Sequence, residues 1–128
     1  MDCIFCNIVT GNIPAKKLFE NEDVLAFLDI NPLTNGHCLV IPKKHYESIF
    51  DIDKEILQKV TIAAQDISIK IKKSLRPVGV NLVSNNGKKA GQRVFHFHVH
   101  IIPRYQEEEM GKIVAMMDIA EIAKRVKF

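Results

Sequence analysis

The sequence predicts an α+β fold in which a five-stranded antiparallel sheet carries its helices on one face. Short apolar runs bounded by turn residues come first, a long amphipathic stretch follows, and further apolar runs with hairpin-like links come last. The chain has 128 residues, 47% of them hydrophobic, which suffices for one core but not for two ordinary domains. We therefore expect a single domain over residues 1–128, with residues 106–128 as a C-terminal extension.

The N-terminal part predicts a short helix and three strands. Residues 3–10 are suited to one or two helical turns, which Gly11 and Pro14 interrupt. Apolar runs bounded by polar turns predict the first three strands: residues 18–20, 24–30 and 37–41. Pro42 ends the third strand, because proline has no N–H to donate to a sheet.

The rest of the chain predicts two more helices and two more strands. Residues 53–75 predict the longest helix, since one of its faces is apolar: Ile56, Val60, Ala63, Ile67 and Ile71. Asp53 is suited to cap this helix, and Pro77 and Gly79 end it. Two strands joined by a glycine-containing loop, and a final helix, complete the fold: residues 80–84, 94–103 and 113–126.

Composition argues against a membrane or nucleic-acid partner. No apolar run approaches the roughly 18 residues that a membrane span needs, and no basic stretch followed by an apolar one opens the chain. The net charge of +3 comes from lysines in short scattered pairs, not from a continuous basic stripe. We expect a cytoplasmic protein, and its ligand could be a small anion.

Three histidines at every second position are the most informative feature: His96, His98 and His100. Alternate side chains of a strand share a face, so these residues predict a row of imidazoles, while Phe97 and Val99 pack on the core. Such a row suits either metal ligation or phosphoryl chemistry on histidine. In the second case His98 attacks phosphorus, and its neighbours orient it or protonate the leaving group.

The loop before this strand is suited to contact phosphate. Gly91 permits close backbone approach, so the N–H groups of residues 91–94 and the Arg93 side chain could reach phosphate oxygens. A glycine turn alone does not define a site, so this expectation depends on the histidines that follow it.

Together these residues resemble a known family. Residues 96–102 are similar to the histidine triad signature, His-φ-His-φ-His-φ-φ, of the HIT superfamily of nucleotide hydrolases and transferases. Further segments look like its Hint branch: residues 13–16, 25–32, 36–45 and 85–87. The resemblance covers residues from about 3 to 105, and it implies the HIT-like sheet, a purine nucleotide ligand and a homodimer in which the sheet pairs with a second copy.

The resemblance also implies roles for single residues. His98 matches the nucleophile that attacks the α-phosphate, His100 matches the group that assists the leaving group, and His37 matches a histidine that supports their hydrogen-bond network. His96 completes the catalytic triad, and Asp29 matches the acid that binds the ribose hydroxyls. The purine is expected between four apolar side chains: Phe5, Ile8, Phe27 and Ile30. The phosphate is expected on the loop formed by five residues: Asn85, Gly91, Gln92, Arg93 and Val94.

A metal site is a separate expectation. Cys3 and Cys6 form a C-x-x-C, which in a cytosolic protein indicates metal or redox chemistry, and His45 and His96 are the best candidates to complete four-coordinate zinc. Some prokaryotic-type HIT proteins carry such a structural zinc beside the triad. Two alternatives stay open: ordinary reduced thiols that pack a short helix, or one catalytic metal on the three triad histidines themselves.

The function expected from these features is nucleotide hydrolysis. The enzyme would cleave at the α-phosphate of nucleoside phosphoramidates or dinucleoside polyphosphates through a covalent nucleotidyl-histidine, releasing an AMP-like product without an organic cofactor. The alternatives are a nucleotide-binding sensor or interaction protein without significant turnover, and a nucleotidyltransferase that uses the same intermediate. Intact His98 and His100 argue against a sensor, since binding needs no nucleophile.

Overall fold

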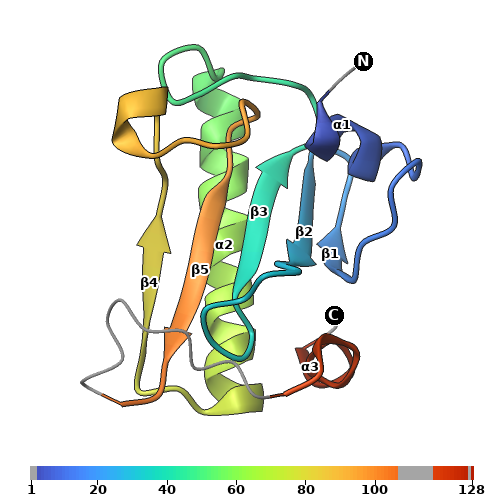
Figure 1. The fold of residues 1–128 in the computed structure, drawn as a ribbon, viewed down its shortest axis with the longest axis vertical. Helices are drawn as coiled ribbons and strands as arrows, with labels where there is room; N and C mark the ends of the chain where they lie inside the picture. The colour runs from blue at the N-terminus through green and yellow to red at the C-terminus, as the bar shows by residue number, and fades with distance from the viewer. Residues whose placement is uncertain (1–2, 107–116, 127) are drawn as a thin grey trace.

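The computed structural model describes residues 3–106, 117–126 and 128. Its centre is an antiparallel five-stranded sheet in the order β1-β2-β3-β5-β4 (Figure 1). The strands span these residues: β1 Lys17–Glu20, β2 Val24–Leu28, β3 Cys38–Pro42, β4 Gly79–Val83 and β5 Val99–Arg104. The five-stranded antiparallel sheet expected from the sequence is confirmed.

Three α-helices and one 3-10 turn accompany the sheet: α1 Ile4–Val9, α2 Lys54–Leu75, η1 Lys88–Ala90 and α3 Ile119–Val126. The Asp53 side chain accepts the backbone N–H of Ile56, which caps α2 as expected. The helix ends at Leu75 and is followed by Arg76, whose φ is 55°. The final helix was expected over residues 113–126, of which residues 113–116 lie outside the described part. No helix of the described residues is both long and apolar enough to cross a membrane.

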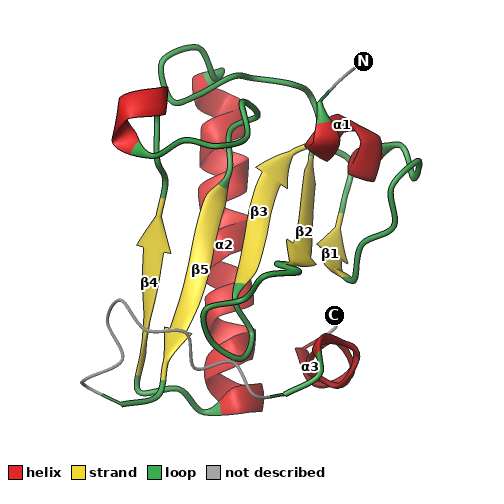
Figure 2. Ribbon diagram, viewed as in Figure 1, coloured by secondary structure: helices red, strands yellow, loops and turns green. Residues whose placement is uncertain are grey.

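Helices cover both faces of the sheet. Val24, Ala26 and Leu28 of β2 belong to an apolar cluster with α2 and α3, whereas Leu25 and Phe27 point to the other face and pack with α1. Figure 2 shows α2 behind the sheet and α1 on the opposite side. The expectation that all helices share one face is therefore wrong. Every side chain of β2 is apolar, so both faces of this strand must be shielded from water by packing against other elements.

The strand that carries the triad begins later than expected. The ladder between β3 and β5 stops at the pair Val40 and Val99, and continuing its register would place Pro42 opposite Phe97. Proline has no N–H for that ladder, and the N–H of Phe97 donates instead to the carbonyl of Tyr46 at 2.7 Å. A single strand over residues 94–103 was thus the wrong expectation, and only the third triad histidine lies in β5.

Candidate active site

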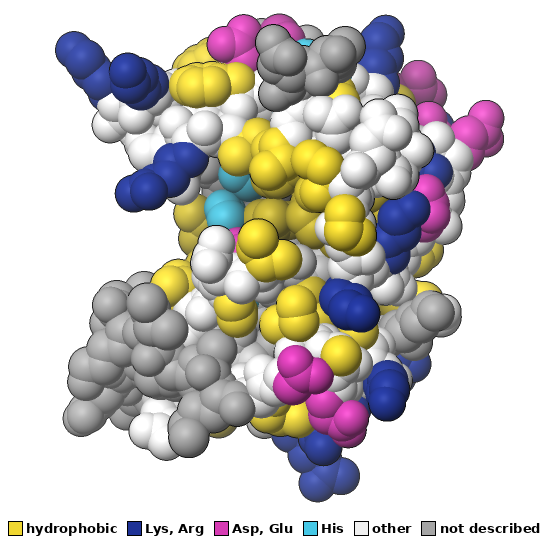
Figure 3. Space-filling view, turned by 45° about the vertical axis from the view of Figure 1, so that its right-hand side comes forward, with side chains coloured by type: hydrophobic (Ala, Val, Ile, Leu, Met, Phe, Trp, Pro, Cys, Tyr) yellow, Lys and Arg dark blue, Asp and Glu magenta, His cyan; other side chains and the backbone are white. Residues whose placement is uncertain are grey.

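A cavity of about 490 Å³ opens on the α1 face of the sheet, at the loop that precedes β5. Its walls include most of the residues expected to bind or react with a nucleotide: Phe5, Ile8, Phe27, Asp29, Ile30, Asn85, Gly91, Arg93, Val94, His98 and His100. Figure 3 shows a hollow lined with apolar side chains, with histidine exposed at its edge. A larger cavity of about 770 Å³ between β1 and α3 has no histidine or cysteine in its walls, so we place the site in the smaller one.

The central histidine, His98, has one ring nitrogen free to react. Its Nδ1 lies 2.8 Å from the carbonyl oxygen of His96, which can only accept, so Nδ1 carries the proton and donates. Burial lowers the pKa of His98 and keeps the ring neutral, which leaves Nε2 unprotonated. The ring of Phe5 packs edge-on against His98 at 5.2 Å between centroids. This arrangement fixes the orientation of a neutral imidazole whose Nε2 lone pair is a nucleophile.

His37 fixes the proton position on His100. The backbone N–H of Leu33 donates to Nδ1 of His37 at 3.0 Å, so a neutral His37 carries its proton on Nε2. That Nε2–H donates to Nδ1 of His100 at 2.9 Å, which leaves the His100 proton on its own Nε2. Burial, aided by the neighbouring rings of His98 and His37, lowers the pKa of His100 to about 4. His100 therefore presents a neutral N–H donor beside the His98 ring, whose centroid is 5.0 Å away.

Asp29 is a wall residue of the same cavity. One of its oxygens, Oδ1, accepts the backbone N–H of Asn31 at 2.9 Å, and Oδ2 lies 3.6 Å from Nε2 of His37. Two carboxylate oxygens offer about four acceptor positions, so acceptor capacity remains for a diol. The carboxylate is thus held in place and can still accept from a ligand.

The loop between β4 and β5 reaches the cavity through Asn85 and Gly91. Gly91 has a φ of 96°, in the left-handed region that favours glycine, and a Cβ there would lie 3.7 Å from the Asn85 side chain. Gln92 is not part of the cavity wall. Its side chain is buried, accepts the N–H of Gly87 at 2.8 Å and donates to the carbonyl of Glu47 at 2.6 Å, so it anchors the loop from behind.

The four residues expected to hold a metal lie together at one end of the sheet. The nitrogen Nδ1 of His96 is 3.4 Å from Sγ of Cys3, 3.5 Å from Sγ of Cys6 and 3.2 Å from Nδ1 of His45. Tetrahedral zinc with standard bond lengths separates its ligand atoms by about 3.4–3.8 Å, so the cluster fits such an ion. His96 donates from Nε2 to the carbonyl of Pro42 at 2.8 Å, which leaves Nδ1 free as a ligand.

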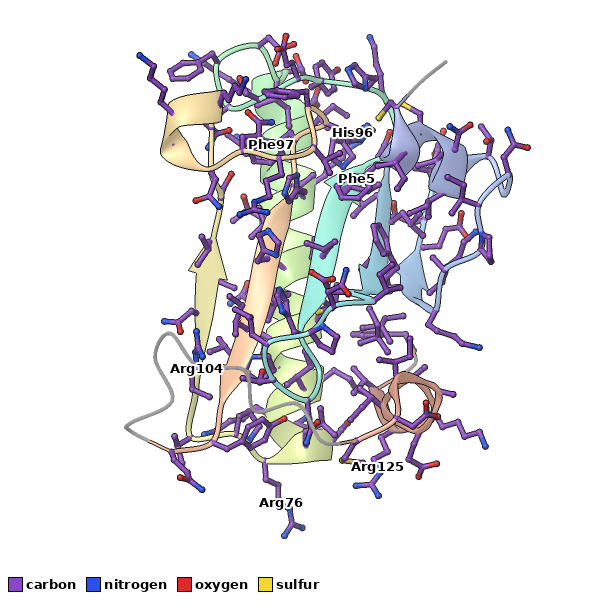
Figure 4. The ribbon with its side chains drawn as sticks, viewed as in Figure 1. Phe5, Arg76, His96, Phe97, Arg104 and Arg125 are labelled. Atoms are coloured by element: carbon purple, nitrogen blue, oxygen red, sulfur yellow. The ribbon has the colours of Figure 1, made fainter. Side chains whose placement is uncertain are left out.

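His96 lies between the cysteine–histidine cluster and the His98 ring. Its own ring is fully buried and contributes Nδ1 to that cluster, while its carbonyl accepts Nδ1–H of His98; Figure 4 shows His96 and Phe5 at the same end of the sheet. The structure does not bring the three triad nitrogens together as ligands of one ion. A second group, Asp29, His37 and His100, is also close enough for a metal. The 2.9 Å between its two imidazole nitrogens is a hydrogen-bond distance, shorter than the about 3.4 Å between nitrogens bound to one tetrahedral ion.

Comparison with known proteins identifies the family. The HIT domain pattern matches residues 10–107. The chain belongs to the HIT family. Protein hit from Bacillus subtilis is 50% identical to this HIT protein over 104 residues, which cover 81% of this chain and 72% of that one.

Two further relatives bear on chemistry. Adenosine 5'-monophosphoramidase from Schizosaccharomyces pombe is 44% identical over 108 residues, covering 84% of this chain and 78% of that one. The crystal structure of a Zn-bound histidine triad family protein from Mycobacterium smegmatis superposes with a TM-score of 0.91 at 37% identity, covering 99% of this chain and 91% of that one.

Sequence reasoning missed the backbone groups that organise this HIT site. The carbonyl of Pro42 and the N–H of Leu33 each fix one histidine tautomer, yet neither residue has a side chain that would indicate such a role. Gly36 opens the segment of residues 36–45, and no separate role was expected of it. It precedes His37 with a φ of 91°, and a Cβ there would lie 2.6 Å from Cδ1 of Leu75, so glycine permits the close approach of this turn to the end of α2.

Proposed function

We propose that this HIT protein is a nucleotide hydrolase that cleaves at the α-phosphate of nucleoside phosphoramidates or dinucleoside polyphosphates and releases AMP or a similar product. One observation carries the proposal: the neutral His98 keeps Nε2 free at the cavity wall, beside a second neutral imidazole that donates from its Nε2. Binding alone requires neither a free nucleophile nor an adjacent donor. The phosphoramidase relative supports the substrate class.

The cavity divides into a nucleoside part and a phosphate part. The apolar walls are suited to a purine ring: Phe5, Ile8, Phe27 and Ile30. Asp29 accepts the ribose hydroxyls, which places the α-phosphate near His98 and the loop residues Asn85 and Gly91.

The reaction runs in two displacements. First, Nε2 of His98 forms a bond to phosphorus while the bond from phosphorus to the leaving group breaks, and the leaving atom departs with the electron pair under a hydrogen bond from Nε2–H of His100. Water then attacks phosphorus, breaks the bond to His98 and frees the nucleotide. Backbone N–H groups of the loop stabilise the charge that develops on the phosphate oxygens.

We also propose that Cys3, Cys6, His45 and His96 hold a structural zinc ion. When bound, zinc would cross-link α1 to the segment before β5 and take no part in the displacements. The zinc-bound relative from Mycobacterium smegmatis supports this assignment. The site is separate from the reactive nitrogens, since the His98 ring is held by a carbonyl and contributes no atom to the cluster.

We propose further that two copies pair through β4. This strand is at the edge of the sheet, and apolar side chains at its ends are exposed, with Val78 at 67% and Leu82 at 52%. An open edge with apolar side chains is suited to pairing with the same strand of a second copy.

Turnover assays test the proposed activity. The protein is incubated with AMP conjugated to an amine and, separately, with diadenosine polyphosphates, and AMP release is followed by chromatography. We expect release from at least one class and a loss of about a thousandfold or more in His98→Ala, with AMP still bound. Normal turnover in that variant would contradict the mechanism, and binding without any turnover would favour the sensor.

A further inference from the structure

The loop between β4 and β5 carries positive charge with no acidic residue beside it in the sequence. Lys88, Lys89 and Arg93 lie between residues 84 and 98, a stretch that contains no acidic residue. Together they contribute three positive charges, in a chain whose net charge is +3. We call these three residues the basic loop. Arg93 is a cavity wall residue, and Figure 3 shows basic side chains beside the hollow, on the side where histidine is exposed.

The backbone of the basic loop is firmly held. Lys88 and Lys89 form the turn η1 between Gly87 and Gly91, whose φ values of 97° and 96° reverse the chain on either side. The buried Gln92 side chain holds this turn in place, since it accepts the Gly87 N–H and donates to the Glu47 carbonyl. The two lysines are therefore exposed on a fixed support next to the cavity.

Within residues 3–106, 117–126 and 128 these charges have no acidic partner. Lys43 and Lys59 are paired with acids at 2.8 Å, but among the residues that the structure describes none forms an ion pair with the basic loop. Exposed charges of one sign around a concave site attract a ligand of opposite sign and raise its association rate.

The basic loop adjoins the cavity: Gly91 and Arg93 are wall residues, and the turn with Lys88 and Lys89 directly precedes Gly91. In the proposed binding mode the apolar walls and Asp29 take the nucleoside and His98 and Gly91 take the phosphate, so this turn is the charged segment next to a group attached beyond the phosphate. Acidic side chains are absent from that part of the described cavity wall. We propose that the basic loop selects substrates whose leaving group is anionic, an inference that rests on the proposed hydrolase function.

The chemistry of the step is unchanged by this selection. The bond from Nε2 of His98 to phosphorus forms as the phosphorus–nitrogen bond of a phosphoramidate breaks, and the amine nitrogen keeps the electron pair. The amine takes up one proton, which passes from water through His100, and a hydroxide equivalent from water completes AMP in the second step. The two lysines of the basic loop contact only the far end of the departing amine.

Two AMP phosphoramidates that differ only at that far end test the inference. One carries butylamine and the other 3-aminopropylphosphonate, so the bond that breaks is the same and only the distal group differs, uncharged in the first and anionic in the second. We expect kcat/KM at low salt to be about tenfold higher for the phosphonate conjugate, and we expect high salt to remove most of this difference.

Variants identify the residues responsible. In the double variant Lys88→Gln with Lys89→Gln the ratio of the two kcat/KM values should fall to about twofold or less, and Arg93→Gln should also lower it. The matched control is Lys73→Gln, which removes one exposed charge at the far end of α2 and should leave the ratio at the wild-type value. Thermal melting confirms that each variant is folded.

The outcomes separate this inference from the function on which it rests. Equal kcat/KM for the two conjugates in the wild type, or an unchanged ratio in the double variant, would overturn the selection and leave the hydrolase intact. Failure of the wild type to cleave either conjugate or any diadenosine polyphosphate would overturn both.

Discussion

The Nε2 atom of His37 lies 2.9 Å from Nδ1 of His100, and the Leu33 N–H decides which of these two nitrogens carries the proton. The two hydrogen bonds therefore run in one direction, from the Leu33 N–H to His37 and from His37 to His100. His100 is left with its own N–H donor on Nε2. His37 itself is not a wall of the cavity. In the proposed mechanism His37 is a positioning residue, which acts through the tautomer of His100.

Replacing His37 should lower kcat with little effect on nucleotide binding. His37→Leu removes the donor to His100, so the N–H beside the nucleophile is no longer fixed, and we expect kcat to fall about a hundredfold. His37→Gln places an amide N–H near the same position and should restore part of that loss. Equal losses in both variants, measured alongside the dissociation constant for AMP, would contradict a role through the tautomer.

Acid should destabilise the protein in a range set by the buried imidazoles. The pKa of His100 falls from its ordinary 6.5 to about 4, and burial also lowers the pKa of His37. Between pH 6.5 and 4 these histidines bind protons in the unfolded chain but stay neutral in the folded protein. The free energy of unfolding therefore declines as pH falls from 6.5 toward 4. His100→Gln should show a weaker decline over this range in urea titrations. A pH profile identical to the wild type would refute this assignment.

Metal removal should lower stability more than it lowers catalysis. A chelator that extracts zinc from Cys3 and Cys6 should reduce the free energy of unfolding by at least about 3 kcal/mol, and readdition of zinc should restore it. Cys6→Ser should abolish the response to chelator. Cys38→Ala should keep the response, because Cys38 is buried in the sheet and outside the cluster. Turnover that disappears and returns in strict proportion to zinc would instead indicate a catalytic metal.

Disruption of the β4 edge should produce monomers. Leu82→Lys places a charge on the exposed strand, which disfavours pairing of two edges. Sedimentation velocity should show a dimer for the wild type and a monomer for this variant. The control is Phe50→Lys, at a side chain that is 84% exposed in the loop before α2, and it should stay dimeric. A wild-type monomer at high concentration would contradict the pairing.

The elements predicted from the sequence are those in which a local pattern decides the structure. The period of the apolar residues and the cap at Asp53 specify α2, and Pro42 ends β3 at the expected place. The start of β5 could not be predicted, because it depends on which residue of β3 stands opposite Phe97. That pairing is a property of the register between distant segments.

In the candidate site too, local motifs predicted some features, whereas others depend on contacts between segments far apart in the sequence. Motifs indicated the candidate side chains, and the cavity brings most of them together. Sequence could not show that Gln92 turns away to anchor its loop, since side-chain direction in a loop follows from contacts with segments far along the chain. Nor could it show which nitrogen of each histidine is protonated, because backbone groups at Leu33, Pro42 and His96 decide this.

The central claim is that His98 becomes covalently bonded to the nucleotide. Intact-protein mass spectrometry after rapid acid quench of the enzyme with an AMP phosphoramidate measures this directly, and peptide mapping locates the adduct. The account predicts one added nucleotidyl group on His98, absent in His98→Ala and accumulating if water attack is slowed. AMP release at full rate with no adduct at any quench time, or an adduct on another residue, would contradict it.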